Sequence, residues 1–168
     1  MSAVRHRLMF RESERRLASA QILRGAADAS DSAYLLELLA FELLLKLLFE
    51  KTTRSIAPGH HRYVEIFDSL SQAMQDEVVR LAGERVGPSQ LSPNFCSVLK
   101  DLGSNFVKLR YPFESYSQMT ETEYESVGAE WMANGAKEAE ADFRYYPEEL
   151  LGLTTALQTL VRAPEILT

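Results

Sequence analysis

Seven residues with polar, potentially reactive side chains interrupt a sequence that is otherwise rich in leucine and other apolar residues. They fall in three short groups, within residues 40–52, at residues 59–61 and at residues 110–114. The residues are Glu42, Lys46, His60, His61, Arg110, Tyr111 and Glu114. Because an unpaired charge buried among apolar side chains is costly, we expect the three groups to meet in the folded protein.

A convergence of these groups would suit phosphate chemistry. His60 or His61 could accept or donate a proton, and the guanidinium of Arg110 could bind a phosphate group. Glu42 would supply the acid of such a site, and the ring of Tyr111 could stack on a nucleobase. The types of residue therefore point to a site for RNA or a nucleotide.

The same residues also have a purely structural interpretation. Glu42 could pair with Arg110 or Lys46, and His60 could hold the start of a helix. Such a network would fix the register of neighbouring helices and perform no chemistry. Both interpretations predict that the groups lie close together, but only the first predicts that they open onto a cleft.

Patterns that bind metals or cofactors in other proteins are not recognisable in this sequence. The adjacent His60 and His61 lack the i, i+4 spacing that puts two imidazoles on one helix face. Cys96 is the only cysteine, so it can form neither an internal disulfide nor a cysteine-based metal cluster, and we expect it to be buried or inert. We therefore expect neither a metal site nor a cofactor.

Length and composition are those of an ordinary globular domain. The chain has 168 residues, of which 46% are hydrophobic and 25% are charged. Residues 33–49 are very apolar but include Glu37, Glu42 and Lys46, whereas a membrane span needs about 20 residues that are nearly free of charge. This segment predicts a central core helix, and the absence of a signal-peptide pattern predicts a cytoplasmic protein without a membrane segment.

Charge is distributed unevenly along the chain, whose net charge is −6. Residues 1–27 contain six arginines and two glutamates, whereas residues 114–149 contain ten acidic residues and only Lys137 and Arg144 as cations. The overall acidity argues against a protein wholly devoted to nucleic-acid binding. The basic segment could touch phosphates, or it could pair with the acidic segment of the same or a second chain.

Hydrophobic periodicity predicts helices along the whole chain. The expected helical ranges are 5–27, 31–53, 61–70, 72–84, 93–112, 120–132 and from 147 onward. Only residues 142–146 could be extended, even as a short strand. The sequence therefore predicts an all-α fold, an antiparallel bundle of about five to six helices.

Local signals predict several helix ends and core contacts. Ser71 and the Thr120-Glu121-Thr122-Glu123 segment are typical of helix N-termini, and Pro112 should end or bend the helix before it. Apolar residues at helical spacing are expected to contact the core. They include Leu8, Phe10, Leu17, Ala20, Ile22, Leu23, Leu99, Leu102, Phe106, Leu109 and Phe113.

The order of these elements resembles the HEPN superfamily (higher eukaryotes and prokaryotes nucleotide-binding). Glu42 and Lys46 on the second helix, Gly59-His60 before the third, and Arg110-Tyr111 followed by Glu114 carry the resemblance. It implies a helical bundle in which these residues form the ligand-binding site. Members of the superfamily include metal-independent ribonucleases that act as homodimers, so the resemblance also implies a homodimer.

The resemblance covers roughly residues 15–115. It implies one HEPN-like helical domain over residues 1–168, with a core over residues 5–115 and an acidic helical extension over residues 116–168. The setting of the family implies a role in stress or phage defence.

The sequence departs from the ribonuclease motif of the family, in which an arginine is followed about one turn later by a histidine on the same helix. No histidine follows Arg110, and Pro58-Gly59 separates Arg54 from His60. We therefore expect a non-catalytic interaction module that binds a partner protein, RNA or a nucleotide. The alternative is a divergent metal-independent endoribonuclease, in which His60 or His61 transfers a proton and Arg110 stabilises the charged phosphorane.

Overall fold

The computed structural model describes residues 3–27, 30–137 and 141–163, and within them the regular secondary structure is helical. The all-α prediction is therefore confirmed. The described residues form seven α-helices and one 3-10 helix, more than the five or six expected for the bundle. The elements are α1 (Ala3–Gly25), α2 (Ser32–Thr53), α3 (Tyr63–Asp68), α4 (Gln72–Val86), α5 (Leu91–Lys108), η1 (Pro112–Tyr116), α6 (Glu121–Ala133) and α7 (Pro147–Arg162).

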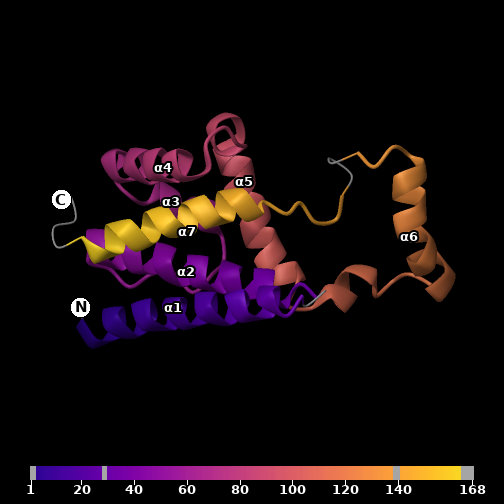
Figure 1. Ribbon diagram of the computed structural model, residues 1–168, viewed down its shortest axis with the longest axis horizontal. Coiled ribbons are helices and arrows are strands. Elements are labelled where there is room, and N and C mark those ends of the chain that lie inside the picture. Colours follow the sequence, from indigo (N-terminus) through magenta and orange to yellow (C-terminus); the bar gives the residue numbers. More distant parts are fainter. Residues whose placement is uncertain (1–2, 28–29, 138–140, 164–168) are drawn as a thin grey trace.

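Helix α2 lies at the centre of the bundle (Figure 1). It packs against α1, α3, α5 and α7, which explains why it is apolar nearly all round. Leu38, Leu44 and Leu48 in α2 are fully buried. An ionisable side chain on this helix must therefore either reach the edge of the bundle or find a partner inside it.

Local sequence signals set several of the helix ends. The hydroxyl of Ser71 accepts a hydrogen bond from the amide of Met74 and caps α4, as predicted. Thr120 and Glu123 form the predicted capping box at the start of α6. Helix α5 ends at Lys108, and Pro112 begins the 3-10 helix that follows.

Several predicted contacts are corrected by the structure. Leu8 and Ile22 in α1 are 45% and 72% exposed, because no element among the described residues packs on the face of α1 opposite α2. Phe113 is 64% exposed, because the break after α5 ends the helical spacing that related it to Phe106. Cys96 is exposed and not buried. Residues 142–146 are not helical, but they form no strand with any other described segment.

The segment expected as a C-terminal extension divides into two parts. Helix α7 belongs to the core, since Leu150, Leu153 and Leu157 are buried and the helix packs against α2 and α4. Gly152 allows a close approach to α4, because a Cβ at that position would lie 2.9 Å from Cγ1 of Val86. Helix α6, in contrast, has no buried residue and stands apart from the bundle (Figure 1).

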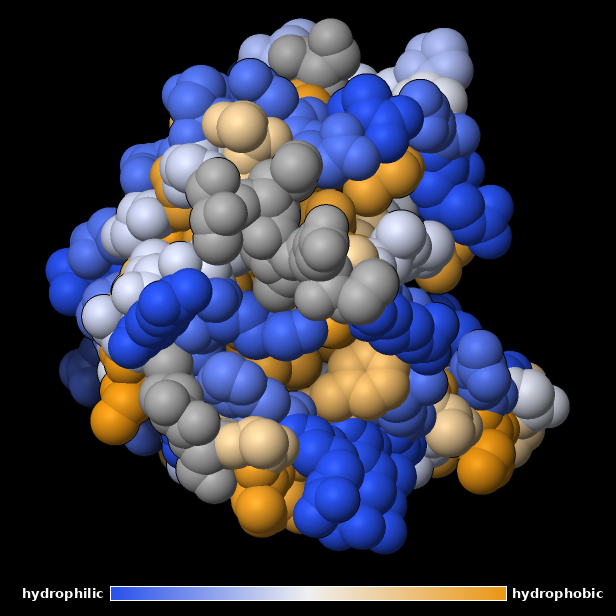
Figure 2. Space-filling model, turned by 90° about the vertical axis from the view of Figure 1, so that its left-hand side faces the viewer, coloured by the Kyte–Doolittle hydropathy of each residue, from blue (hydrophilic) through white to orange (hydrophobic). Residues whose placement is uncertain are grey.

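The surface at one end of the bundle combines hydrophilic and hydrophobic residues. Figure 2 shows the end at which α1 begins and α7 ends, where hydrophilic residues predominate and hydrophobic residues form small separate patches. Among the described residues, no helix combines the length and the apolar character needed to span a membrane.

Candidate functional site

Glu42 is the centre of a polar cluster in the middle of the bundle. Its side chain is only 8% exposed, yet three neighbours surround its carboxylate. Oε1 accepts a hydrogen bond from Nζ of Lys46 at 2.8 Å, and Oε2 accepts one from the hydroxyl of Tyr63 at 3.0 Å. Oε2 also lies 2.7 Å from Nδ1 of His61. The carboxylate is thus compensated by one cation and by two further polar groups.

The local geometry of α2 accounts for the Lys46 contact. Residues four positions apart lie on the same face of a helix, so Lys46 reaches back one turn to Glu42. Glu42 was expected to pair with Arg110 or with Lys46, and Lys46 forms the ion pair. Arg110 does not: no ion pair joins it to Glu42 or Glu114.

His61, just before α3, and Tyr63, its first residue, both contact Glu42. Tyr63 is buried, and its ring packs edge-on against Phe41 of α2 at a centroid distance of 5.2 Å. Burial, together with the adjacent Glu42 carboxylate, raises the pKa of the Tyr63 hydroxyl well above its ordinary value, and the charge of Arg110 acts in the opposite direction. Tyr63 is therefore a fixed hydrogen-bond donor to Glu42 and not a candidate acid.

Gly103 in α5 allows the His61 segment to lie against the bundle. A Cβ at this position would lie 2.7 Å from the backbone carbonyl oxygen of His61, which is closer than non-bonded atoms approach. The absence of a side chain at Gly103 thus determines how closely His61 can approach α5. The sequence shows an isolated glycine, but only the tertiary contact reveals its role.

Phe106 of α5 links His61 to Arg110. The His61 ring lies against the Phe106 ring at a centroid distance of 4.8 Å, and the Arg110 guanidinium lies over the same ring at 4.6 Å. Arg110 also lies 5.9 Å from the ring centre of Tyr111. The imidazole and the guanidinium therefore meet on one aromatic ring, with Arg110 at the exposed edge, whereas the Glu42 carboxylate contacts His61 and not Arg110.

A groove opens beside this cluster. Its volume is about 580 Å³, and it lies between the segment that includes His60 and His61 and the face of α5 that includes Lys100, Gly103 and Val107. His61 and Tyr63 belong to both features, since both line the groove and both contact the Glu42 carboxylate. When Nδ1 of His61 donates its proton to Glu42, Nε2 of a neutral imidazole carries a lone pair and can act as a base.

The remaining predicted site residues lie further from Glu42. His60 lines the groove, but Nε2 lies 3.7 Å from the carboxylate of Glu65, and Nδ1 accepts a hydrogen bond from the amide of Arg62. Tyr111 is 54% exposed, and Glu114 is exposed on η1. These last two residues contact neither Glu42 nor the groove.

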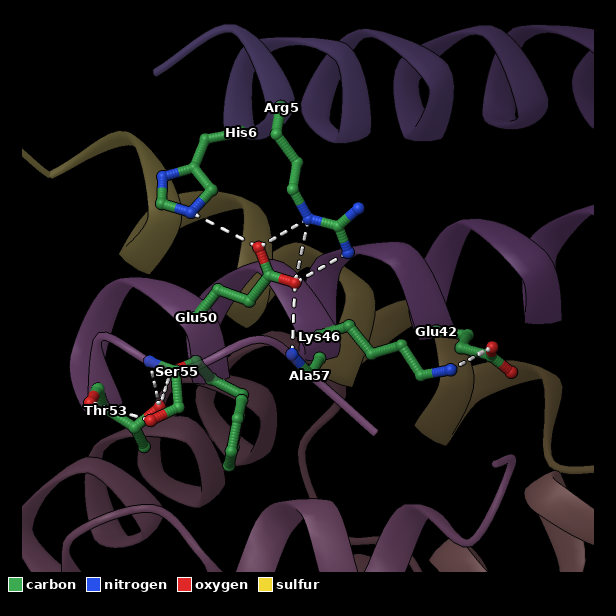
Figure 3. A network of polar contacts seen from close by, with 9 residues as sticks. Arg5, His6, Glu42, Lys46, Glu50, Thr53, Ser55 and Ala57 are labelled. Carbon is green, nitrogen blue, oxygen red and sulfur yellow. Dashed lines mark hydrogen bonds and ion pairs between the residues drawn. The ribbon is translucent and has the colours of Figure 1, made fainter. Parts of the chain in front are cut away.

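A second polar cluster lies on the same face of α2, two turns beyond Glu42. The Glu50 side chain is fully buried, and it accepts hydrogen bonds from the Arg5 guanidinium at 2.8 to 3.1 Å and from the amide of Ala57 at 3.1 Å (Figure 3). Nε2 of His6 lies 3.4 Å from the carboxylate. Burial raises the pKa of Glu50, but the hydrogen bonds from Arg5 and Ala57 outweigh it, and the pKa is lower than its ordinary value.

The Glu50 cluster was not predicted from the sequence. Its signal was nevertheless present, because Glu50 follows Glu42 and Lys46 at the i, i+4, i+8 positions of one apolar helix. The residues that hold it, Arg5 and His6, come from the start of α1 (Figure 3). This cluster fastens the N-terminal end of α1 to the centre of the bundle.

The described part of the chain contains no group of three or more histidine, cysteine, aspartate or glutamate side chains arranged to hold a metal ion. Comparisons with protein-family models, with curated proteins and with solved structures find no match to this chain.

Proposed function

We propose that this protein is a HEPN-like interaction module that binds an anionic partner, RNA or a nucleotide, at the groove beside His61. One observation carries the proposal. Lys100 and Arg110 are exposed near His61, and neither forms an ion pair within the described residues. Cations with no counter-charge beside an apolar groove suit a ligand that combines phosphate with a flat base.

In this proposal the Glu42 cluster has a positioning role. Glu42 is occupied by Lys46, His61 and Tyr63, so it does not contact the ligand. It holds the His61 ring in place at the groove, and Arg110 supplies the phosphate contact. The resemblance to the HEPN superfamily supports the same choice of residues and implies a cytoplasmic homodimer that acts in stress or phage defence. A partner protein with an acidic surface would use the same cations.

A divergent metal-independent ribonuclease is the second candidate, and a specific contact favours it. The Glu42 carboxylate can hold the proton of His61 on Nδ1, which leaves Nε2 to accept the proton of a 2′-hydroxyl. Arg110, on the same Phe106 ring, would stabilise the charged phosphorane. In the usual ribonuclease motif the histidine and the arginine lie on one helix. Here the imidazole of His61 and the guanidinium of Arg110 come from different segments of the chain.

The test is the binding of a fluorescein-labelled single-stranded RNA of mixed sequence, measured by fluorescence anisotropy, with ATP as a competitor. Arg110→Ala and Lys100→Ala should each weaken binding about tenfold or more, since a hydrogen bond to a charged group contributes roughly 1.5–3 kcal/mol. The control is Arg85→Ala, which removes an exposed arginine on α4. If wild-type protein binds neither RNA nor ATP, or if Arg85→Ala weakens binding equally, the site is not at this groove.

Catalysis is tested on the same samples by gel electrophoresis of the RNA in the presence of EDTA. The interaction-module proposal predicts intact RNA bound to the protein. The ribonuclease alternative predicts cleavage that is lost in both His61→Gln and Arg110→Ala and retained in Arg85→Ala. His60→Gln separates the two adjacent histidines, because His60 faces Glu65 and not Glu42.

A further inference from the structure

An arm of residues 112–133, comprising η1, α6 and the turn between them, extends from the bundle, and among its described elements η1 alone packs substantially against a bundle helix, α5. None of its residues is buried, and α6 has no substantial packing contact with any helix of the bundle (Figure 1). The arm nevertheless has large apolar side chains. Those that are more than two-fifths exposed are Phe113, Met119, Tyr124 and Met132.

The arm is also strongly acidic. Helix α6 contains four glutamates and neither lysine nor arginine. Glu123 closes the capping box, but Glu121 and Glu125 form no ion pair within the described residues. At helical spacing Glu121, Glu125 and Met132 lie on one face, so this face combines negative charge with an exposed apolar group.

The outer face of α1 has the complementary chemistry. Val4 is 52% exposed and Leu8 is exposed beside it, on the side of α1 that faces away from α2. Arg7 and Arg11 lie on the same side at i, i+4 spacing, and neither forms an ion pair within the described residues. This face is therefore both basic and apolar, and no described residue of the chain covers it.

The arm cannot reach this face within one chain as the structure stands. Helix α6 stands beyond the end of α1 that leads into α2, whereas Val4 to Arg11 occupy the opposite, N-terminal half of α1 (Figure 1). A second copy of the chain can supply the missing surface. Because each chain has one arm and one basic face, two copies can satisfy both pairs at once in a closed two-fold arrangement.

We propose that the arm of each chain docks on the outer face of α1 in a second copy, and that this reciprocal contact forms the homodimer. This contact rests on the proposed function, which includes a homodimer, and it specifies the interface of that homodimer. The residues of the interface differ from those of the RNA or nucleotide site. In antiparallel register Glu125 pairs with Arg7 and Glu121 with Arg11, and Met132 then extends past Arg7 toward the exposed Val4. Apolar contact supplies affinity, and opposite charges fix the register of the two helices.

Sedimentation velocity on two charge-reversal variants tests the contact. Arg7→Glu/Arg11→Glu makes both α1 and the arm acidic, and Glu121→Lys/Glu125→Lys makes both basic. Each variant alone should dimerise at least about tenfold more weakly than the wild type, because like charges would face each other in both contacts. The control Asp68→Lys/Asp76→Lys places the charge change of the Glu121→Lys/Glu125→Lys variant on exposed residues of α3 and α4 and should leave the dimer intact.

An equimolar mixture of the two variants identifies the reciprocal geometry. In the mixed dimer both contacts pair opposite charges, so dimerisation should return to the wild-type level. An arm that folds back on its own α1 predicts no recovery on mixing. The proposal is overturned if the mixture stays monomeric, if the reversals leave the dimer unchanged, or if the wild type is a monomer throughout the concentration range. RNA binding measured on the same samples is a separate readout. If the wild-type protein dimerises but does not bind RNA, the proposed function fails and the proposed dimer contact stands.

Discussion

The Oε2 atom of Glu42 lies 2.7 Å from Nδ1 of His61, although the two residues are 19 positions apart in the chain. This contact joins the central helix to the edge of the groove. A carboxylate held inside the bundle thereby fixes an imidazole whose side chain is 29% exposed.

Glu42→Gln should lower the free energy of unfolding by about 3 kcal/mol, because it leaves the largely buried Lys46 without a counter-charge. Urea denaturation monitored by circular dichroism measures the change. In Glu42→Gln/Lys46→Met the loss should be smaller than the sum of the two single losses, since the residues share one interaction. Glu77→Gln, which breaks a solvent-exposed pair with Arg80, should cost much less. Equal stability of Glu42→Gln and wild type would contradict the buried pair.

Acid should destabilise the protein in part through Glu50. Since its folded pKa lies below its unfolded value of about 4.3, Glu50 contributes stability at pH values above that point. The contribution is lost as the pH falls through the lower folded value. Urea unfolding between neutral and acidic pH should therefore show a shallower acid limb for Glu50→Gln than for wild type. Glu84→Gln, an exposed substitution on α4, is the control, and parallel curves for Glu50→Gln and wild type would refute the assignment.

Gly103→Ala should destabilise the protein by about 1–3 kcal/mol, because the new Cβ would collide with the carbonyl oxygen of His61. Displacement of that segment should also weaken RNA binding at the groove. Gly83→Ala is the matched control, since Gly83 lies inside α4 and a Cβ there meets nothing within 4 Å. That control should stabilise the protein by roughly 0.5–1 kcal/mol. Thermal unfolding that ranks the two variants in the opposite order would exclude the close approach.

Thr120→Ala should destabilise α6 locally by about 1 kcal/mol, because it removes the hydroxyl that caps the helix. Global stability should change little, since α6 buries no residue in the bundle. Hydrogen exchange resolved along the chain would show faster exchange confined to the arm. Ser71→Ala removes the corresponding cap from α4, whose Met74 and Val78 are buried, and should lower global stability instead. An equal effect of both variants on global unfolding would mean that α6 is part of the cooperative core.

The apolar pattern of α1 does not predict which of its residues are buried. Helical periodicity identifies Leu8 and Ile22 as apolar residues on a helix, but it does not reveal which face of that helix a neighbour covers. The same limit applies to Phe113, which is apolar at helical spacing and yet lies beyond the end of α5. Exposure at such positions depends on the arrangement of whole helices.

Features that arise within a few residues follow from the amino-acid sequence alone. Ser71 and Thr120 cap helices, Pro112 stops α5 from continuing, and Lys46 reaches Glu42 one turn away, because the interacting atoms belong to one stretch of backbone. Which distant segments meet depends on the folded structure. Arg5 on Glu50, His61 and Arg110 on Phe106, and α7 within the core all depend on how the helices pack, and many packings satisfy the same apolar pattern.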